Sequence, residues 1–353
     1  MHSLCWKLIA TILITLGSAS IAQAVCEGPQ AKVCVAEGIA LLKAAEPDPA
    51  GAAALFERAC KSGAMSGCTA LGVLAEQGKG TTRDPHRAAN LFELACDGGE
   101  AQGCLNLGHL VMTTRIIKGE PSRALTLFER ACDLKLMGGC YNAALIRLSD
   151  DKKLQNEKEA ARLFLVACTG GDMQACFNAG VQYAEGSGVK RNLRKAKKLF
   201  EQACLGGDPS GCTNLGVLYE KEKGTRKNLQ RAHQLYQQGC EKGDMLGCVN
   251  LGLMHETGRG AAKDEPKAER LFIQACKQEL VAGCWRLGRR LIKRPEREKE
   301  GQALLQAACA EGQPNSCFDF AQSLLGQNTS IEKVRPFLLR ACTGGVKEAC
   351  KKL

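Results

Sequence analysis

Cysteine is the residue whose number and spacing point most clearly to chemistry in this sequence. The 353-residue chain contains 21 cysteines, and all except Cys5 fall into pairs with the spacing C-x7-C. Paired thiols can form disulfides or help to hold zinc. Successive pairs begin 36 residues apart from Cys60 to Cys276, with 34 residues before this stretch and 33 after it. The ten pairs are Cys26–Cys34, Cys60–Cys68, Cys96–Cys104, Cys132–Cys140, Cys168–Cys176, Cys204–Cys212, Cys240–Cys248, Cys276–Cys284, Cys309–Cys317 and Cys342–Cys350.

The N-terminus has the features of a secretory signal peptide. Lys7 supplies a positive charge, residues 8–16 form a short apolar stretch, and Ala22-Gln23-Ala24 fits the A-x-A cleavage pattern. An N-terminal anchor helix is the alternative, but the apolar run is shorter than the roughly 18–20 residues that span a membrane. We therefore predict that residues 1–24 are removed and that the mature chain, with no membrane span, is periplasmic or extracellular.

The spacing and the compartment together favour disulfides over zinc. Structural zinc sites usually take cysteines two to four residues apart and need four ligands. Removal of residues 1–24 also removes Cys5, and an even set of cysteines in an exported chain indicates a disulfide framework. The sequence thus predicts ten disulfides within the pairs, no metal site, no cofactor and no free thiol nucleophile.

Five asparagines repeat in register with the cysteines. Each stands two residues after the second cysteine of a pair: Asn106, Asn142, Asn178, Asn214 and Asn250. A side-chain amide both donates and accepts hydrogen bonds, so a regular row could bind the backbone of an extended peptide. The alternative is that each amide bonds to the turn that starts its own helix. The sequence leaves both interpretations open.

Basic residues are concentrated in three segments. The complete chain has a formal net charge of +11, and the segments are residues 190–198, 221–227 and 286–297. Such a charge distribution favours acidic partners, including anionic polymers of the cell envelope, although solvated helix faces are the simpler explanation. Nucleic acid is not an expected partner, because the chain leaves the cytoplasm and has only 5% aromatic residues for base stacking.

Two helices must position the residues of each repeat. Before the first cysteine, apolar positions with helical spacing define one helix, which we call helix B; Ala196, Leu199, Phe200 and Ala203 are one example. After the second cysteine, a Leu-Gly or Ala-Gly dipeptide lies in a further helical stripe, which we call helix A. Glycine inside a helix costs about 1 kcal/mol relative to alanine. Its recurrence predicts that a neighbouring helix approaches too closely for a side chain.

Helix B must end between the two cysteines of a pair. Eight residues of one helix separate Cα atoms by about 12 Å, whereas a disulfide needs them within about 7 Å. A helix-closing glycine in the left-handed conformation is predicted three residues after the first cysteine, at Gly63, Gly99, Gly171, Gly207, Gly243, Gly312 and Gly345. Asp172, Asp208 and Asp244 then follow as N-caps of helix A. Each bridge closes a loop of about nine residues and contributes roughly 2.5 kcal/mol.

These features together resemble a known family. Sel1-like repeats, which are relatives of the tetratricopeptide repeat, resemble two segments of this sequence, residues 177–189 and residues 212–219. The resemblance includes Ala196 and Leu199-Phe200, which follow the first of these segments. The added C-x7-C pair is similar to the Helicobacter cysteine-rich protein family of secreted, disulfide-bridged Sel1 proteins. The resemblance covers residues 26–353. The sequence departs from the family pattern in residues 112–121, 149–157 and 288–300, which lack the Gly-x-Gly turn. We expect irregular geometry in these three loops.

The resemblance implies an all-α fold, an α/α superhelical solenoid of helix pairs that each carry a disulfide. We expect residues 25–353 to form a single solenoid of about nine repeats of 33–36 residues. Solenoids bind ligands on an extended concave face. The first functional expectation is therefore an exported scaffold that binds a peptide or protein, with acidic ligands favoured.

The second expectation, a penicillin-binding protein with slow β-lactamase activity on β-lactam or cell-wall-related ligands, rests on the resemblance alone. Serine β-lactamases carry S-x-x-K together with S-D-N and K-T-G. Here S-x-x-K occurs only at Ser149, Ser187 and Ser330, and the other two motifs are absent from the sequence. We interpret these matches as coincidences and identify no catalytic residue. The four histidines after residue 24 come from different repeats, and we expect one of them, His255, to pack where other repeats have tyrosine.

Overall fold

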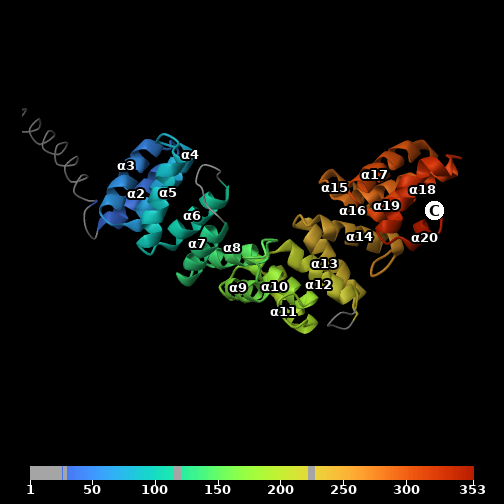
Figure 1. Ribbon diagram of the computed structural model, residues 1–353, viewed down its shortest axis with the longest axis horizontal. Coiled ribbons are helices and arrows are strands. Elements are labelled where there is room, and N and C mark those ends of the chain that lie inside the picture. Colours follow the sequence, from blue (N-terminus) through green and yellow to red (C-terminus); the bar gives the residue numbers. More distant parts are fainter. Residues whose placement is uncertain (1–25, 27–29, 114–120, 222–226) are drawn as a thin grey trace, which may run out of the picture. The chain divides into compact units, whose positions relative to one another are not determined.

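The computed structural model describes residue 26 and residues 30–113, 121–221 and 227–353. Within these ranges every regular element is a helix (Figure 1). The chain divides into two compact units, Met1–Asp172 and Met173–Leu353. The predicted signal peptide, residues 1–24, lies outside the described residues, and the single solenoid over residues 25–353 stays a prediction.

The described part of the first unit contains four pairs of helices. Its helices are α2 (Ala31–Lys43), α3 (Pro49–Lys61), α4 (Met65–Gln77), α5 (Pro85–Asp97), α6 (Ala101–Thr113), α7 (Pro121–Asp133), α8 (Met137–Arg147) and α9 (Glu157–Thr169). Even-numbered helices are the predicted A helices and odd-numbered helices are the predicted B helices. Each helix packs against the next one, and α4 also contacts the A helices α2 and α6.

The second unit continues the same alternation. It contains α10 (Met173–Glu185), α11 (Leu193–Leu205), α12 (Pro209–Glu220), α13 (Leu229–Glu241), α14 (Met245–Thr257), α15 (Glu265–Lys277), α16 (Val281–Leu291), the 3₁₀ helix η2 (Pro295–Arg297), α17 (Glu298–Ala310), α18 (Pro314–Gly326), α19 (Ile331–Thr343) and α20 (Lys347–Cys350). The A helices α10, α12, α14 and α16 each contact the next A helix, so that the series ends at α18. They therefore form one continuous wall in this unit. The predicted solenoid of paired helices is confirmed.

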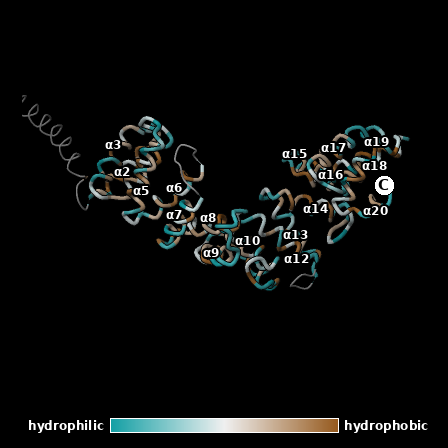
Figure 2. Tube along the Cα trace, viewed as in Figure 1, coloured by the Kyte–Doolittle hydropathy of each residue, from teal (hydrophilic) through white to brown (hydrophobic). Residues whose placement is uncertain are grey.

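The predicted apolar stripe of the B helices forms the core. Phe92, Phe164 and Phe200 are at most 2% exposed, and the alanines that lie eight residues before the first cysteines from Cys60 to Cys276 are fully buried. Along the helices, hydrophobic and hydrophilic stretches alternate (Figure 2), because one side of each helix packs against its neighbours. No helix in the described ranges combines the length and apolarity that a membrane crossing requires.

The glycines inside the A helices receive aromatic rings from the following B helices. A Cβ atom on Gly72 would lie 2.6 Å from Cε1 of Phe92, and one on Gly180 would lie 2.5 Å from Cε1 of Phe200. The predicted close approach is therefore confirmed, and at these two positions its cause is a side chain. Gly108, Gly216 and Gly252 are in the same situation, facing Phe128, Tyr236 and Phe272. At Gly288 the backbone also approaches closely, because a Cβ atom there would lie 3.0 Å from the carbonyl oxygen of Gly301 on α17.

The turn between helix B and helix A brings the paired cysteines together. The nine bridges with a described geometry have Cα–Cα distances of 4.5 to 5.6 Å. Cys168 and Cys176 are disulfide-bonded as well. The seven glycines predicted to close the B helices all have positive φ, between 82° and 100°. The equivalent position after Cys132 is Lys135, with φ 68°, and that after Cys276 is Glu279, with φ 58°.

Side-chain caps begin both kinds of helix. The predicted caps of helix A are confirmed at Asp208, whose carboxylate accepts from the Gly211 amide at 2.6 Å, and at Asp244, which accepts from Leu246 at 3.1 Å. The sequence analysis missed a second series of caps, twelve residues before the first cysteine, which starts the B helices. Its members are Asp48, Asp84, Asn156, Asn192, Asn228 and Asp264.

Two of the three segments that depart from the Gly-x-Gly pattern are associated with short A helices. The helix α8, which precedes residues 149–157, and the helix α16, which ends with residues 288–291, have 11 residues, whereas α4, α10 and α14 have 13. The helix α6, which runs into the third segment, also has 13 residues. The loop after α16 contains the 3₁₀ helix η2. Most of the third loop, residues 114–120, lies outside the described residues.

Candidate functional site

The five asparagines of the predicted row all lie on A helices. Asn106, Asn142, Asn178, Asn214 and Asn250 lie on α6, α8, α10, α12 and α14 respectively, and each of them is half-buried. The first two belong to the first unit and the other three belong to the second. In the second unit the A helices are direct neighbours, so their asparagines occupy equivalent places along one wall.

Two of these amides are oriented by their own helices. The Nδ2 group of Asn142 donates to the Gly138 carbonyl at 2.7 Å, and that of Asn214 donates to the Ser210 carbonyl at 3.0 Å. In both residues the side-chain oxygen makes no hydrogen bond within the described part of the chain. In Asn106 the side-chain oxygen instead accepts from Nε2 of Gln102, at 2.8 Å.

At Asn142 and Asn214 this geometry agrees with the interpretation that the amide bonds to its own turn, and it is compatible with peptide binding. An amide has two donor hydrogens and two acceptor sites, and one bond to the preceding turn uses only one donor. The bond holds the Asn142 and Asn214 side chains in place and leaves their oxygen available for a ligand N–H group.

The row has a continuation that the sequence analysis did not recognise. Two residues after the second cysteine, α16 has Arg286 and α18 has Asp319, at the position that asparagine holds in α12 and α14. The sequence analysis had assigned Arg286 only to a basic segment. Counting from each second cysteine would have identified it as a member of the row.

Arg286 is held by its neighbours. Its guanidinium lies 4.0 Å from the centroid of the Trp285 ring, and the Trp285 indole donates to Oδ2 of Asp319 at 2.7 Å. The same carboxylate oxygen lies 3.9 Å from Nε of Arg289. Burial, together with the charge of Arg289, lowers the pKa of Arg286. This guanidinium is partly desolvated, yet it makes no ion pair within the described residues.

A cavity of about 390 Å³ lies beside Arg286, between α14, the loop that follows it, and α16. Six basic and two acidic side chains contribute to its wall, so its lining is positively charged. The lining residues are Glu256, Thr257, Lys263, Glu265, Arg286, Arg289, Arg290, Lys293 and Arg294.

Glutamates of the preceding repeat neutralise part of this basic segment. Arg290 is only 12% exposed and pairs with Glu256 at 3.0 Å and Glu265 at 3.3 Å. Arg294 and Arg297 share the carboxylate of Glu269. These three arginines therefore have structural roles.

Three cations of the segment have no close carboxylate partner. Arg286 makes no ion pair in the described ranges, Arg289 has only its 3.9 Å contact with Asp319, and Lys293 is exposed without an ion pair there. The uncompensated charge of this cavity is consequently carried by Arg286, Arg289 and Lys293.

The other basic segments are differently placed. In residues 190–198, Lys195 lies 4.1 Å from the centroid of the Tyr183 ring and Lys197 lies 5.0 Å from that of Tyr219. These two lysines pack the B helix α11 against A helices. Of residues 221–227, only Lys221 and Lys227 belong to the described residues.

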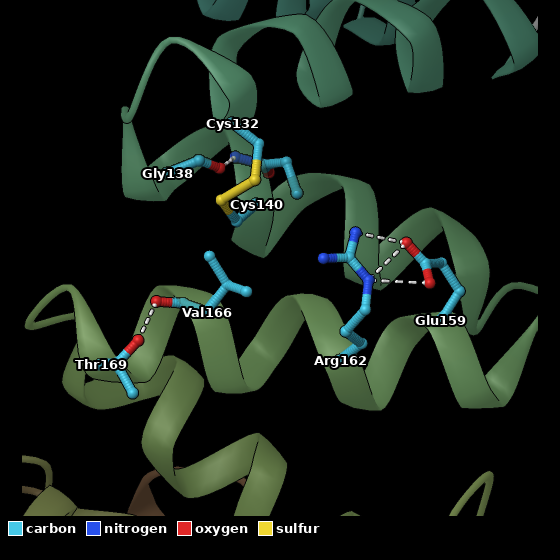
Figure 3. The surroundings of a disulfide bond; sticks show 8 residues. Cys132, Gly138, Cys140, Glu159, Arg162, Val166 and Thr169 are labelled. Atoms are coloured by element: carbon cyan, nitrogen blue, oxygen red, sulfur yellow. Dashed lines mark hydrogen bonds and ion pairs between the residues drawn. A yellow bond between two sulfur atoms is a disulfide. The ribbon is translucent and has the colours of Figure 1, made fainter.

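A second hollow, of about 410 Å³, lies beside the Cys132–Cys140 bridge and resembles the first in size but not in charge. Figure 3 shows Arg162 on α9 beside this disulfide. Its guanidinium is paired with Glu159 of the same helix, with contacts of 2.6 and 3.0 Å. This hydrogen bonding lowers the pKa of Glu159. The arginine charge is thus compensated here, and the hollow offers no free cation from α9.

Two of the histidines, which come from different repeats, meet in the structure. The Nε2 atoms of His233 on α13 and His255 on α14 lie 3.2 Å apart. His255 is buried, as expected for a packing residue, and its Nδ1 lies 3.3 Å from the Ala262 carbonyl. Within the described residues no group of three or more His, Cys, Asp or Glu side chains could hold a metal ion.

The three serines of the S-x-x-K matches lie outside helices. Ser149 and Ser187 are in loops between helices, and Ser330 is an exposed residue directly before α19. A serine nucleophile of this class starts a helix inside a cleft beside its lysine. This placement is in line with interpreting the matches as coincidences.

Comparison with known proteins identifies the repeat. The Sel1 repeat matches residues 33–63, 66–100, 101–136, 139–172, 174–208, 209–244 and 246–280. Among curated protein sequences, none matches this chain.

Two solved structures support the fold, and a third is similar to a smaller part of the chain. A protective antigen present in uropathogenic Escherichia coli strains, displaying an SLR fold, superposes with a TM-score of 0.78 at 19% identity, over 90% of this chain and 69% of that chain. A Sel1 repeat protein from Oxalobacter formigenes gives 0.60 at 21% identity, over 69% and 96%. Helicobacter pylori cysteine rich protein B gives 0.31 at 29% identity, over 37% and 93%.

Proposed function

Because this chain belongs to the Sel1 repeat family, we propose that it is a protein-binding scaffold that binds an extended peptide segment of its partner along the A helices of a single unit. The row of half-buried asparagines is the observation that carries this proposal. Repeat proteins of stacked helix pairs use such extended surfaces for binding.

The asparagines would bind the peptide through its backbone. With Nδ2 of Asn142 and Asn214 anchored to the preceding turn, the side-chain oxygen can accept from a peptide N–H group. Because these side chains are half-buried, such a bond is partly shielded from water and therefore stronger than one at an exposed site. Recognition of backbone rather than side chains suits extended peptides of varied sequence.

The disulfides support a location outside the cytoplasm. Every cysteine from Cys26 onward is disulfide-bonded, and such a density persists only in an oxidising compartment. We propose that residues 1–24 act as a signal peptide and that the mature chain works in the periplasm or outside the cell. β-Lactam hydrolysis is not included in the proposal, because the serines of the S-x-x-K matches lie outside helices and at least one of them is exposed.

The asparagine row can be tested with the double substitution Asn214→Ala and Asn250→Ala. Peptides selected from a random library against the purified full chain should bind the variant at least tenfold more weakly. The reason is that a buried ligand N–H left without a partner costs about 1–3 kcal/mol. Affinity is measured by fluorescence anisotropy, and the melting temperature should stay close to that of the unaltered chain.

The matched control replaces two exposed asparagines outside the row, Asn90→Ala and Asn315→Ala, and should leave peptide affinity unchanged. A row that only stabilises its own helices gives the opposite pattern. The melting temperature of the Asn214/Asn250 variant would fall, while its folded fraction would bind peptides with full affinity. That result would contradict the proposal.

A further inference from the structure

We propose that the cavity beside Arg286 is a carboxylate-binding site, which takes an acidic side chain or the free C-terminus of the peptide bound along α12, α14 and α16. This inference rests on the proposed function, because the site is the continuation of the asparagine row. It specifies the chemical class of the ligand, which is a peptide that carries a carboxylate where it reaches α16.

The register of the repeats places the cation where a bound peptide would arrive. Asn214, Asn250 and Arg286 follow the second cysteines of three successive repeats at the same offset, and their helices α12, α14 and α16 contact one another in order. A peptide backbone that follows Asn214 and Asn250 therefore meets a guanidinium at the next repeat instead of an amide.

The surroundings of Arg286 are organised before any ligand binds. Trp285 supplies a flat surface at 4.0 Å from the guanidinium, and the indole is itself fixed by a 2.7 Å hydrogen bond to Asp319. Arg290, paired with Glu256 and Glu265, forms a fixed part of the cavity wall. A planar guanidinium that is stacked and oriented loses little freedom on binding, so it suits two-point recognition of a carboxylate.

The uncompensated cations of the cavity favour an anionic group on the bound peptide. Arg286, Arg289 and Lys293 have no close carboxylate partner, whereas Glu256 and Glu265, which also line the wall, are paired with Arg290. A carboxylate is the anionic group that an unmodified peptide carries. The partial burial that lowers the pKa of Arg286 also strengthens its interaction with one buried negative charge.

The experiment uses fluorescein-labelled dodecapeptides on the purified full chain, with binding followed by anisotropy. One pair of probes alternates Gly and Glu, and a second pair alternates Gly and Gln. Each composition is made with a free and with an amidated C-terminus, and a further probe alternates Gly and phosphoserine. We expect at least one carboxylate-bearing probe to bind at least tenfold more tightly than the amidated Gly–Gln peptide.

The five probes distinguish the source of the anionic group. Tight binding of both Gly–Glu peptides assigns the site to acidic side chains. Tight binding of the free Gly–Gln peptide, lost on amidation, assigns it to a C-terminus. Tightest binding of the phosphoserine peptide would overturn the carboxylate assignment.

Substitutions locate the effect in the cavity. Arg286→Gln with Arg289→Gln should weaken the preferred carboxylate probe at least tenfold. The control Lys190→Gln with Arg194→Gln removes the same charge from exposed positions of the same unit and should change affinity less than twofold. If the first variant melts at a markedly lower temperature, Lys293→Gln at the exposed rim replaces it, with an expected loss of about threefold.

Two results contradict the carboxylate site. Equal loss in the cavity and control variants would show that only net charge matters. Equal affinity for the Gly–Glu and Gly–Gln peptides in both terminal forms, or no binding of any probe, would show that no carboxylate is recognised. If library peptides still bind and still depend on Asn214 and Asn250, the scaffold proposal survives this failure. If they do not, both proposals are wrong.

Discussion

Single residues at the inter-helix turn differ in conformational cost. The residue three positions after the first cysteine has a positive φ in every repeat where that residue is described, and in seven of these repeats it is glycine. Lys135 and Glu279 adopt the same conformation with a side chain attached. A left-handed conformation costs an ordinary residue roughly 1–2 kcal/mol, so these two turns are less favourable than their counterparts.

Replacing Lys135 or Glu279 by glycine should therefore stabilise the protein. We expect a gain of about 0.5–1 kcal/mol for each substitution, because relief of the strained φ exceeds the greater entropy of glycine in the unfolded chain. The measurement is the shift of the denaturation midpoint in guanidinium chloride, with the disulfides intact. Lys135→Ala is the control, since alanine keeps the strained conformation and should give no gain. A destabilised Lys135→Gly variant would show that the lysine side chain contributes more than the strain costs.

At the scale of the helix, aromatic residues and glycines form complementary pairs. Most buried rings of the B helices fit over a glycine of the preceding A helix, as Phe200 does over Gly180. The helix α8 has the fully buried Ala144 at the equivalent position, before Phe164. The interlocking of glycine and ring thus defines the spacing between most helix pairs, while α8 accommodates a methyl group there.

The contact between α13 and α14 should make stability depend on pH. Burial lowers the pKa of His233, and the charges of His255 and Lys267 add to this effect. The unfolded chain then binds a proton more readily than the folded one. The contribution of the neutral His233 side chain to the free energy of unfolding is fully present above the pKa of the histidine in the unfolded chain, about 6.5. It is lost as the pH falls from there through the lower pKa of His233 in the folded protein. We expect a lower melting temperature at pH 5 than at pH 7.5.

The substitution His233→Gln should remove this part of the pH dependence, measured as the difference between melting temperatures at pH 5 and pH 7.5. The control His86→Gln changes an exposed histidine in the other unit and should leave the difference unchanged. A His233→Gln variant with the same difference as the unaltered chain would show that the histidine pair does not cause it.

At the scale of the whole molecule, stability should be local. Each repeat packs mainly on its neighbours in sequence, and nine of the disulfides are known to close single turns. Solenoid stability is approximately a sum of repeat and neighbour terms. Damage to one repeat should therefore spread little along the chain.

The substitution Phe200→Ala tests this locality. Phe200 is 2% exposed and packs in a core with Ala196, Leu215 and Leu218, so its loss should cost about 3–5 kcal/mol. Amide hydrogen exchange should accelerate in α10 to α13 and stay unchanged in α18 and α19. The control Leu205→Ala removes a side chain that is 81% exposed on the same helix. Uniform acceleration along the chain would indicate one cooperative core instead.

Much of the fold could be predicted because its determinants are local and repeated. The C-x7-C spacing, the glycine three residues later and the stripe around Phe200 each act within one turn or one helix. Their physical requirements are therefore visible in a single repeat, and the resemblance to Sel1-like repeats supports the same reading. The residues that cap the B helices recur with the same regularity, so they too could have been predicted from the sequence.

The tertiary structure decided which polar groups remain available. Arg290 is neutralised by Glu256, which is 34 residues away, and Arg294 and Arg297 share Glu269. Arg286 and Arg289 belong to the same basic segment, and no sequence pattern separates them from these paired neighbours. The His233–His255 contact is hidden for the same reason. Ion pairs and side-chain contacts depend on the angle at which repeats stack, and that angle arises from packing rather than from the period of the sequence.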